Sequence, residues 1–352
     1  MFVDAHLDLA YNALAGYDPR LPLEEARSSP AGRRAAARGE TPVVSLPALR
    51  EGGVGLVFGT LFVLPKGAPG DLTGETYSSP EEAHRAAGRQ VDYYQGLESE
   101  GLIQLIGGQS DLATLVTAQA EHRDDAGLGV VLLMEGADPI RQPAELEWWF
   151  DRGVRIVGPA WAATRYSGGT AMPGPLTVAG RDLMTELDRT GVALDTSHMA
   201  EESFWQAMRL HRGPAIASHS NCKTLVPTDR HLSDDMIRAI VDRDGVIGVV
   251  LYNHFLDPRW NPGDPKSAVG LATVVRHIEH MCEIAQDTRH VGIGTDFDGG
   301  FGYESIPAEL RSCADLALVG QALERAGWRP DEAEAVLGGN WLRWLQGALP
   351  AW

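Results

Sequence analysis

The sequence lacks the features that mark secreted, membrane-bound and disulfide-stabilised proteins. It has three cysteines among 352 residues, with no CxxC spacing, so no disulfide framework is expected and a reducing compartment is favoured. No stretch of roughly 18 apolar residues occurs. The start, MFVDAHLDLA, has no basic segment of a signal peptide, and the end has no long hydrophobic tail of a lipid-anchor signal. These absences predict a soluble, cytoplasmic protein without a membrane partner.

Positive charge is also scarce. The chain has 30 Lys and Arg against 48 Asp and Glu, a formal net charge of −18. Nucleic-acid phosphate would be repelled, so we expect no nucleic-acid partner. The one basic cluster, between Arg33 and Arg38, is short and is predicted to be solvated surface. With 44% apolar residues, the composition is that of a folded protein whose length suits one large α/β barrel or two ordinary domains.

Two histidines stand at the ends of two neighbouring predicted strands. The segments VALDTSHM and PAIASHS each end in a Ser-His step, at His198 and His219, and the segment between them has helical spacing. Ligands gather at the carboxyl ends of parallel strands, where two imidazoles can share a metal ion. The alternative, that each histidine only caps its strand, is open for either residue taken alone.

Strands and helices are predicted to alternate along the whole chain. The predicted strands begin near residues 3, 54, 128, 154, 192, 215, 246 and 291, and the residues at 102–106 read as an accessory strand. We expect a helix from Pro80 to about Glu100, with Ser79 as its cap, closing helices over 307–326 and 331–346, and a long irregular loop over 17–42. No linker divides the chain, which predicts a single (β/α)8 TIM barrel as one domain over residues 1–352. A doubly wound open sheet is the alternative.

Six acidic and imidazole side chains follow the predicted strands: His6, Asp8, Glu135, His198, His219 and Asp296. Gathered at one barrel rim, they would repel one another or be costly to desolvate unless cations were present. Imidazole and carboxylate suit zinc, and two such ions can activate a hydroxide held between them as the nucleophile.

We expect two Zn²⁺ ions in this centre. His6 and Asp8 are assigned to one ion, His198 and His219 to the other, and Glu135 to a bridging position. None of the three lysines ends a predicted strand, so the bridge is expected to be this glutamate and not a carboxylated lysine.

Several motifs together resemble the membrane (renal) dipeptidases and their bacterial relatives, a family of binuclear zinc peptidases. They are DAHLDL, LPALREGGVGLVFGTLFV, LLMEGAD, DTSHM, ASHSN, RHLSD, GIGTDFDG and GGNWLRWL, in family order. The resemblance implies a metallo-dependent hydrolase barrel with the same five metal ligands. It also implies that Asp296 shuttles a proton and that Arg230 holds the terminal carboxylate of a dipeptide, including one with a D-residue at the C-terminal side. Related proteins are often dimers, so a homodimer is expected.

One position departs from the family. Where animal members carry a histidine after the fourth strand, this sequence has Trp161, which offers one indole N–H. We expect Trp161 to line the substrate site and to change the substrate range. Two alternatives therefore stay open: hydrolysis of another amide or ester, such as an N-acyl amino acid or a lactone, and a non-enzymatic binding protein with an inactive site.

A few other residues complete the predictions. Asp298 could share the face of Asp296, and His231 and His254 follow strands and could line the pocket. The histidines predicted on helices or helix ends are expected to face solvent: His84, His122, His211, His277, His280 and His290.

Overall fold

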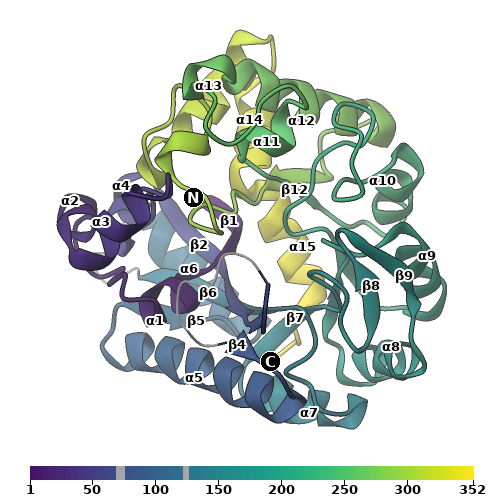
Figure 1. Cartoon of the computed structure of the whole chain (residues 1–352). Helices are drawn as coiled ribbons and strands as arrows, with labels where there is room; N and C mark the ends of the chain where they lie inside the picture. Colours follow the sequence, from purple (N-terminus) through teal and green to yellow (C-terminus); the bar gives the residue numbers. More distant parts are fainter. Residues whose placement is uncertain (69–75, 122–126) are drawn as a thin grey trace.

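A ring of parallel strands organises the computed structural model, which describes residues 1–68, 76–121 and 127–352 (Figure 1). Around the ring the order is β11-β10-β7-β6-β2-β1-β13-β12. The ring nearly closes through a parallel bridge between Ala217 and Ile247, where the Gly248 N–H donates to the Ala217 carbonyl at 2.8 Å. The predicted barrel is confirmed. The barrel strands are β1 (Phe2–Leu7), β2 (Val54–Phe62), β6 (Leu128–Glu135), β7 (Val154–Gly158), β10 (Ala193–Asp195), β11 (Ala215–Ile216), β12 (Ile247–Val249) and β13 (Val291–Ile293).

Short strands lie outside this ring. β5 (Ile103–Leu105) pairs only with β6, as expected of an accessory strand. After β2 and β7 come two small sheets, β3 (Leu64–Pro65) with β4 (Thr76–Tyr77), and the hairpin of β8 (Ser167–Gly169) and β9 (Met172–Leu176).

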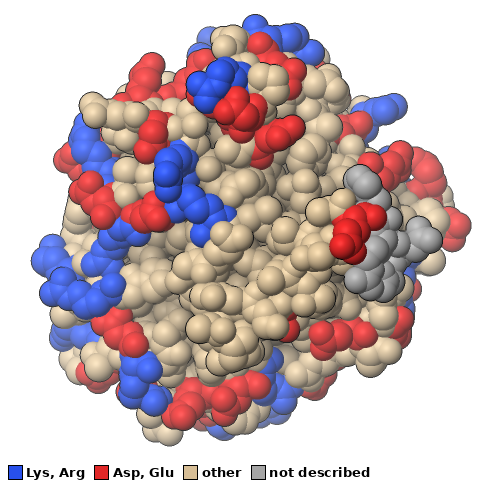
Figure 2. All heavy atoms as spheres, turned by 180° about the vertical axis from the view of Figure 1, so that it is seen from behind, with Lys and Arg blue, Asp and Glu red and all other residues tan. Residues whose placement is uncertain are grey.

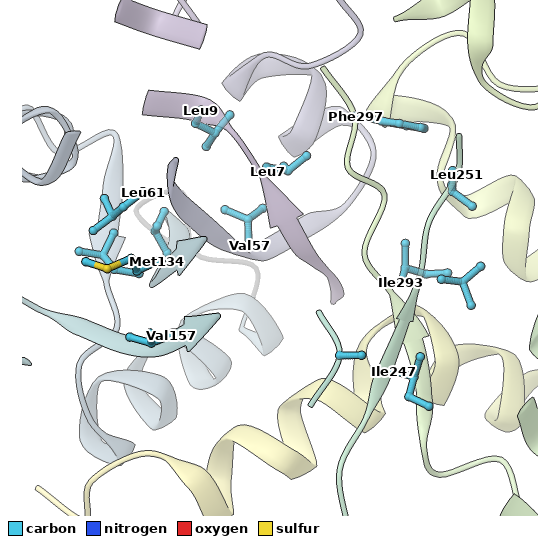
Figure 3. Close-up of a cluster of buried hydrophobic side chains, with 14 of the residues drawn as sticks. Leu7, Leu9, Val57, Leu61, Met134, Val157, Ile247, Leu251, Ile293 and Phe297 are labelled. Atoms are coloured by element: carbon cyan, nitrogen blue, oxygen red, sulfur yellow. The ribbon is translucent and has the colours of Figure 1, made fainter. Parts of the chain in front are cut away.

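The strands β2 and β6 are buried on both faces, so their sequences are apolar runs and not alternations of apolar and polar residues. One buried cluster takes alternate residues from nearly every barrel strand, such as Phe58 and Leu133, together with Trp341 and Trp344. Because residues i and i+2 of a strand share a face, this cluster is the barrel interior. A second buried cluster lies between the strands and the helices around them, and Figure 3 shows part of it. Its members Val57 and Met134 are the sequence neighbours of Phe58 in β2 and of Leu133 in β6, so they lie on the outer faces of these strands.

Helices surround the strands, and the yellow helix α15 lies across the middle of the view in Figure 1. As predicted, Ser79 caps α5, accepting from the Glu82 N–H at 3.3 Å. Their bounds are α1 (Leu9–Leu14), α2 (Leu23–Ser28), α3 (Pro30–Ala36), α4 (Leu46–Glu51), α5 (Pro80–Ser99), α6 (Gln109–Ala120), α7 (Leu146–Asp151), α8 (Val178–Thr190), α9 (Glu201–Leu210), α10 (Asp234–Val241), α11 (Asn253–Leu256), α12 (Leu271–Ala285), α13 (Ala317–Arg325), α14 (Pro330–Glu334) and α15 (Asn340–Ala348).

The predicted loop over 17–42 is wrong, because it contains α2 and α3. Ser29 caps α3 by accepting from the Gly32 N–H at 2.9 Å, with Pro30 in the first turn, and Ala31 and Ala35 are buried. Because residues 17–42 are rich in Arg, Gly and Pro, the sequence analysis did not identify this helix start.

The first closing helix, predicted over 307–326, is shorter than expected, because α13 begins at Ala317. The second, predicted over 331–346, is present as α14 and α15, which are joined by a π-helical turn over Ala335–Gly339.

Three histidines expected to face solvent are instead buried. His211, His277 and His290 each point a ring nitrogen at a backbone carbonyl, at 3.1, 3.1 and 2.8 Å respectively. These hydrogen bonds offset the cost of burying an imidazole. His122 lies outside the described residues.

The charge of the surface and the hydrophobicity of the helices are relevant to binding of nucleic acids and membranes. On the face seen in Figure 2, acidic and basic side chains are interspersed around the edge, and the described residues form no continuous basic surface there of the kind that binds nucleic acid. Among the described residues, no helix has the length and apolar character needed to cross a membrane.

Candidate active site

The candidate residues meet at the carboxyl end of the barrel. His6 lies in β1 and Asp8 directly follows it, while Glu135 is the last residue of β6. His198, His219 and Asp296 each lie three residues beyond the end of their strands, β10, β11 and β13. The structure thus brings together, from five strands, the six side chains that the sequence places at strand ends.

Glu135 is at the centre of this cluster. Its Oε2 lies 3.4 Å from His6 Nε2, and its Oε1 lies 3.2 Å from His198 Nε2 and 3.4 Å from His219 Nε2. One carboxylate oxygen therefore faces one group of residues and the second oxygen faces another. Possible ligand atoms of Glu135, His198 and His219 lie within 4.8 Å of one another, and so do those of His6, Asp8 and Asp296.

The ring nitrogens fit metal ligation. His6 Nε2 is buried and has no hydrogen-bond partner among the residues that the structure describes. The Nε2 atoms of His198 and His219 face each other at 2.9 Å, a separation that suits two ligands of one ion. Burial lowers the pKa of His198 to about 4 and that of His219 well below its ordinary value, so both rings are neutral at pH 7.

The acidic groups need added positive charge. Burial and the nearby Glu135 raise the pKa of Asp8 to about 6, and burial raises the pKa of Asp296 well above its ordinary value. At His6, burial opposes the charged ring, but Glu135, Asp296 and Asp8 outweigh burial and raise the pKa to about 10. Without cations, the cluster therefore holds a proton on His6. Divalent cations would satisfy these carboxylates, so the residues present fit a metal centre.

Hydrogen bonds behind the cluster hold several of these side chains. The Thr60 hydroxyl donates to Asp8, and Thr170 Oγ1 lies 2.9 Å from His198 Nδ1. Ser218 Oγ lies beside His6 and His219, and it donates to Asp195 Oδ2 at 2.6 Å. The sequence analysis missed these four residues, although the Ser-His step before His219 and the Asp195 that ends β10 were visible signals.

Asp195 lies near enough to His6 and His219 to resemble a ligand, with its oxygen and their ring nitrogens within 4.8 Å of one another. Its oxygens are already engaged, however. Oδ1 accepts from the backbone N–H groups of Ser197 and Ser218, at 3.0 and 2.9 Å, and Oδ2 accepts the Ser218 hydroxyl. We therefore treat Asp195 as support for the imidazoles and not as a metal ligand.

Two residues of the cluster adopt a backbone conformation that is unusual outside glycine. His198 has φ = 64° and Asp296 has φ = 60°, both in the left-handed region. Such strain persists where the surrounding structure enforces it, and it concentrates at functional sites. A Cβ on Gly299 would lie 2.1 Å from Asp296 Oδ1, so this glycine leaves the space that the carboxylate occupies.

Asp298, the alternative to Asp296, turns away from the cluster. Its Oδ1 and Oδ2 each accept at 2.9 Å, from the backbone N–H groups of Val43 and Val44. By contrast, Asp296 Oδ1 lies 3.9 Å from His6 Nε2. The geometry thus favours Asp296 as the carboxylate that acts at the centre.

A pocket of about 720 Å³ opens over the cluster, and Asp8, Glu135, His198 and Asp296 lie in its floor. Arg230 and Trp161 both line it, as expected, whereas His231 and His254 are not among its lining residues. Aromatic side chains form the walls: Tyr11, Phe62, Trp161, Tyr252, Phe255 and Phe301.

Arg230 is held firmly at the edge of this pocket. Its Nη2 donates to the His219 carbonyl at 2.7 Å, its Nη1 donates to Ser220 Oγ at 3.2 Å, and its guanidinium carbon lies 5.3 Å from the centre of the Phe255 ring. Trp161 packs against Phe62, with ring centres 5.3 Å apart, and its ring centre is 6.4 Å from that of His198. A substrate over the cluster would contact both Arg230 and Trp161.

Comparison with known proteins identifies the family. A family model described as Membrane dipeptidase (Peptidase family M19) matches residues 1–348. The chain belongs to the membrane dipeptidase family. The resemblance inferred from the sequence motifs is therefore confirmed.

The membrane dipeptidase relatives include characterised and uncharacterised proteins. An uncharacterized protein of Klebsiella pneumoniae, from the pqqA 5' region, is 35% identical over 234 residues, which cover 64% of this chain and 83% of that protein. An uncharacterized dipeptidase of Schizosaccharomyces pombe is 27% identical over 99% of this chain and 81% of its own length. A solved metallopeptidase from Rhodobacter sphaeroides, liganded with a phosphinate mimic of L-Ala-D-Ala, superposes with a TM-score of 0.79 at 24% identity, covering 99% of both chains. This likeness shows that the two proteins share the barrel fold.

Proposed function

We propose that this member of the membrane dipeptidase family hydrolyses the peptide bond of dipeptides in a metal-dependent reaction. The observation that carries the proposal is one pocket in which Arg230 stands beside the Glu135-centred cluster. Family membership and the dipeptidases among the relatives support it. The dipeptide mimic bound by the Rhodobacter sphaeroides protein supports a dipeptide substrate, including one with a D-residue at its C-terminal side.

We propose two Zn²⁺ ions as the cofactors. His6 and Asp8 would hold one ion, His198 and His219 the other, and Glu135, with one oxygen toward each group, would bridge them. When bound, such ions activate a water as the nucleophile and polarise the scissile carbonyl.

The remaining steps belong to this chain's side chains. Asp296 would accept a proton from the attacking water and pass it to the leaving amine, because its carboxylate lies at the cluster, with Oδ1 3.9 Å from His6 Nε2. Arg230 would bind the terminal carboxylate with its planar array of N–H donors, which selects peptides short enough to place their C-terminus there. The aromatic walls favour apolar side chains.

The test is the release of free amino acids from a panel of dipeptides, with and without a chelator. We expect hydrolysis that the chelator abolishes and zinc restores. The Glu135→Gln variant is the matched control, because an amide keeps the size of the side chain but cannot supply two anionic oxygens. If the zinc-loaded protein hydrolyses no dipeptide, the proposal is wrong.

The second candidate is the hydrolysis of N-acyl amino acids, which Trp161 favours. Its indole and Phe62 form an apolar wall beside His198 that could hold an acyl chain. A lactone lacks the carboxylate that Arg230 would bind, so its turnover should not depend on Arg230.

Absence of any bound zinc after supplementation would favour the inactive binding protein. The single domain over residues 1–352, the cytoplasmic location and the homodimer stay predictions.

A further inference from the structure

We infer that Ser218 and Asp195 are positioning residues that, through one shared hydroxyl, orient an imidazole ligand of each proposed metal ion. The inference rests on the metal-binding part of the proposed function. Ser218 Oγ lies 2.8 Å from His219 Nδ1, 3.2 Å from His6 Nδ1 and 2.6 Å from Asp195 Oδ2. All four side chains are buried, with at most 1% of each residue exposed.

The donors and acceptors around Ser218 Oγ favour one arrangement of the hydrogens. Asp195 is an acceptor, and its Oδ1 already accepts two backbone N–H groups, so the single hydroxyl hydrogen of Ser218 points to Oδ2. Two lone pairs are left on Ser218 Oγ for the two neighbouring Nδ1 atoms. Both Nδ1 atoms must then carry hydrogen. The Ser197 hydroxyl is more distant, at 3.3 Å, and accepts from the His219 N–H.

This arrangement fixes the opposite nitrogen of each ring. A neutral imidazole with hydrogen on Nδ1 has a free lone pair on Nε2. The Nε2 atoms of His6 and His219 each lie 3.4 Å from Glu135, on different carboxylate oxygens. Ser218 thus orients the Nε2 lone pairs of both histidines, each toward a different oxygen of the proposed bridging carboxylate. The usual outer partner of a ligand histidine supports one ring, whereas this hydroxyl supports two.

The backbone holds the hydroxyl in place. A Cβ on Gly248 of β12, or on Gly294, which directly follows β13, would lie 1.9 Å from the Ser218 carbonyl oxygen, so both segments approach this residue through a glycine. The loop carrying Ser218 is therefore packed too closely to shift when a ring loses its partner. Loss of the hydroxyl should free the rings and leave the fold in place.

His198 provides a comparison within the same site. Its Nδ1 is supported separately, by Thr170 Oγ1 at 2.9 Å. Thr170 therefore acts on a ligand of one ion, while Ser218 acts on ligands of both. This difference makes Thr170→Ala the matched control for Ser218→Ala.

The experiment titrates zinc into metal-free protein against a chromophoric chelator. Ser218→Ala should weaken both binding steps, by about 10- to 100-fold each. Thr170→Ala should weaken one step only, because its hydroxyl contacts the ring of His198 alone among the proposed ligands. Ser218→Thr, which keeps the hydroxyl, should restore both steps. Wild-type binding by Ser218→Ala, or a loss confined to one step, would overturn the inference.

Asp195→Asn gives a second test that does not depend on Ser218→Ala being folded. An amide has one acceptor and one donor side. If its NH₂ group faces Ser218, the hydroxyl must donate to one histidine Nδ1, which moves that ring's hydrogen to Nε2 and removes a ligand. If its NH₂ group faces the two backbone N–H groups, donors face donors and both hydrogen bonds are lost.

We therefore expect zinc binding by Asp195→Asn to be weakened, and the ¹H–¹⁵N spectrum of the zinc form to show a changed imidazole tautomer. Unchanged zinc affinity would contradict the inference. The readout needs no substrate: a protein that binds zinc as described but hydrolyses no dipeptide would support this inference and refute the proposed function.

Discussion

Replacement of Arg230 by alanine tests the recognition of a free carboxylate. A guanidinium has five N–H donors. In Arg230, one N–H of each Nη donates to a protein acceptor, the His219 carbonyl or Ser220 Oγ, and the Nε is buried without a partner among the described residues. Two Nη N–H groups are therefore left for a ligand. The residue is only 4% exposed, so its bonds to a substrate would be poorly screened by water. Two charge-assisted hydrogen bonds there are worth about 3–4 kcal/mol in total.

That free energy corresponds to a loss of about 10²- to 10³-fold in kcat/KM. The assay compares a dipeptide with the same dipeptide bearing a C-terminal amide, in the wild type and in Arg230→Ala. Hydrolysis of the free acid should fall by this factor, mainly through KM if the contact is equally strong before and during reaction. Hydrolysis of the amide should stay close to the wild-type rate.

An equal loss for both substrates would refute the reasoning. It would show that Arg230 acts on the metal centre through its hydrogen bond to the His219 carbonyl and not on the substrate. Zinc content, measured on the same samples, checks this route directly. A variant that keeps its zinc and loses activity on the free acid alone would support carboxylate recognition.

Four further outcomes are expected. Removal of zinc should lower the melting temperature, because buried carboxylates lose their counter-charge. A zinc concentration of about 100 times Kd adds about 2.7 kcal/mol to the free energy of unfolding, and calorimetry can measure this difference. The pKa of His6 is raised to about 10 without metal, so zinc must displace its proton, and the apparent zinc affinity should fall up to about tenfold per pH unit on going from pH 8 to pH 7 in titrations. Asp296→Ala should abolish turnover with little change in the free energy of unfolding. Asp298→Ala leaves two backbone N–H groups, including that of Val43, without an acceptor. It should therefore destabilise the protein by about 1–3 kcal/mol, measured by urea unfolding. Trp161→His should raise kcat on small dipeptides by about tenfold or more by adding an oxyanion donor, and should raise KM for apolar ones; unchanged kinetics would remove Trp161 from the site.

Much of the barrel and of its candidate centre was predictable from the sequence. Buried parallel strands must be apolar throughout, so the runs at β2 and β6 stand out from their helical neighbours. Chemistry at a barrel is confined to the strand ends, which reduced the search to the few residues that follow each run. Glu135 and His219 were found in this way.

The supporting residues were harder to predict, because their partners are far away in sequence. The contact of Ser218 with a second ring involves a residue 212 positions earlier, His6. Asp195 was visible at the end of a strand, but nothing local shows that its oxygens are used by backbone N–H groups. The burial of His277 depends in the same way on a carbonyl from another element, that of Leu256. Spacing along the chain carries no signal for such contacts.

The site separates into a fixed floor and adjustable walls. The floor residues come from strand ends and are held by hydrogen bonds to other barrel elements, as Asp8 is by Thr60 and His6 is by Ser218. The walls come from the loops beyond, where Trp161 and Phe301 meet the pocket through aromatic contacts. A substitution in a wall changes what the pocket accepts without moving a metal ligand. We therefore expect that the departure from the family histidine at Trp161 alters substrate choice and leaves the proposed metal-binding residues in place.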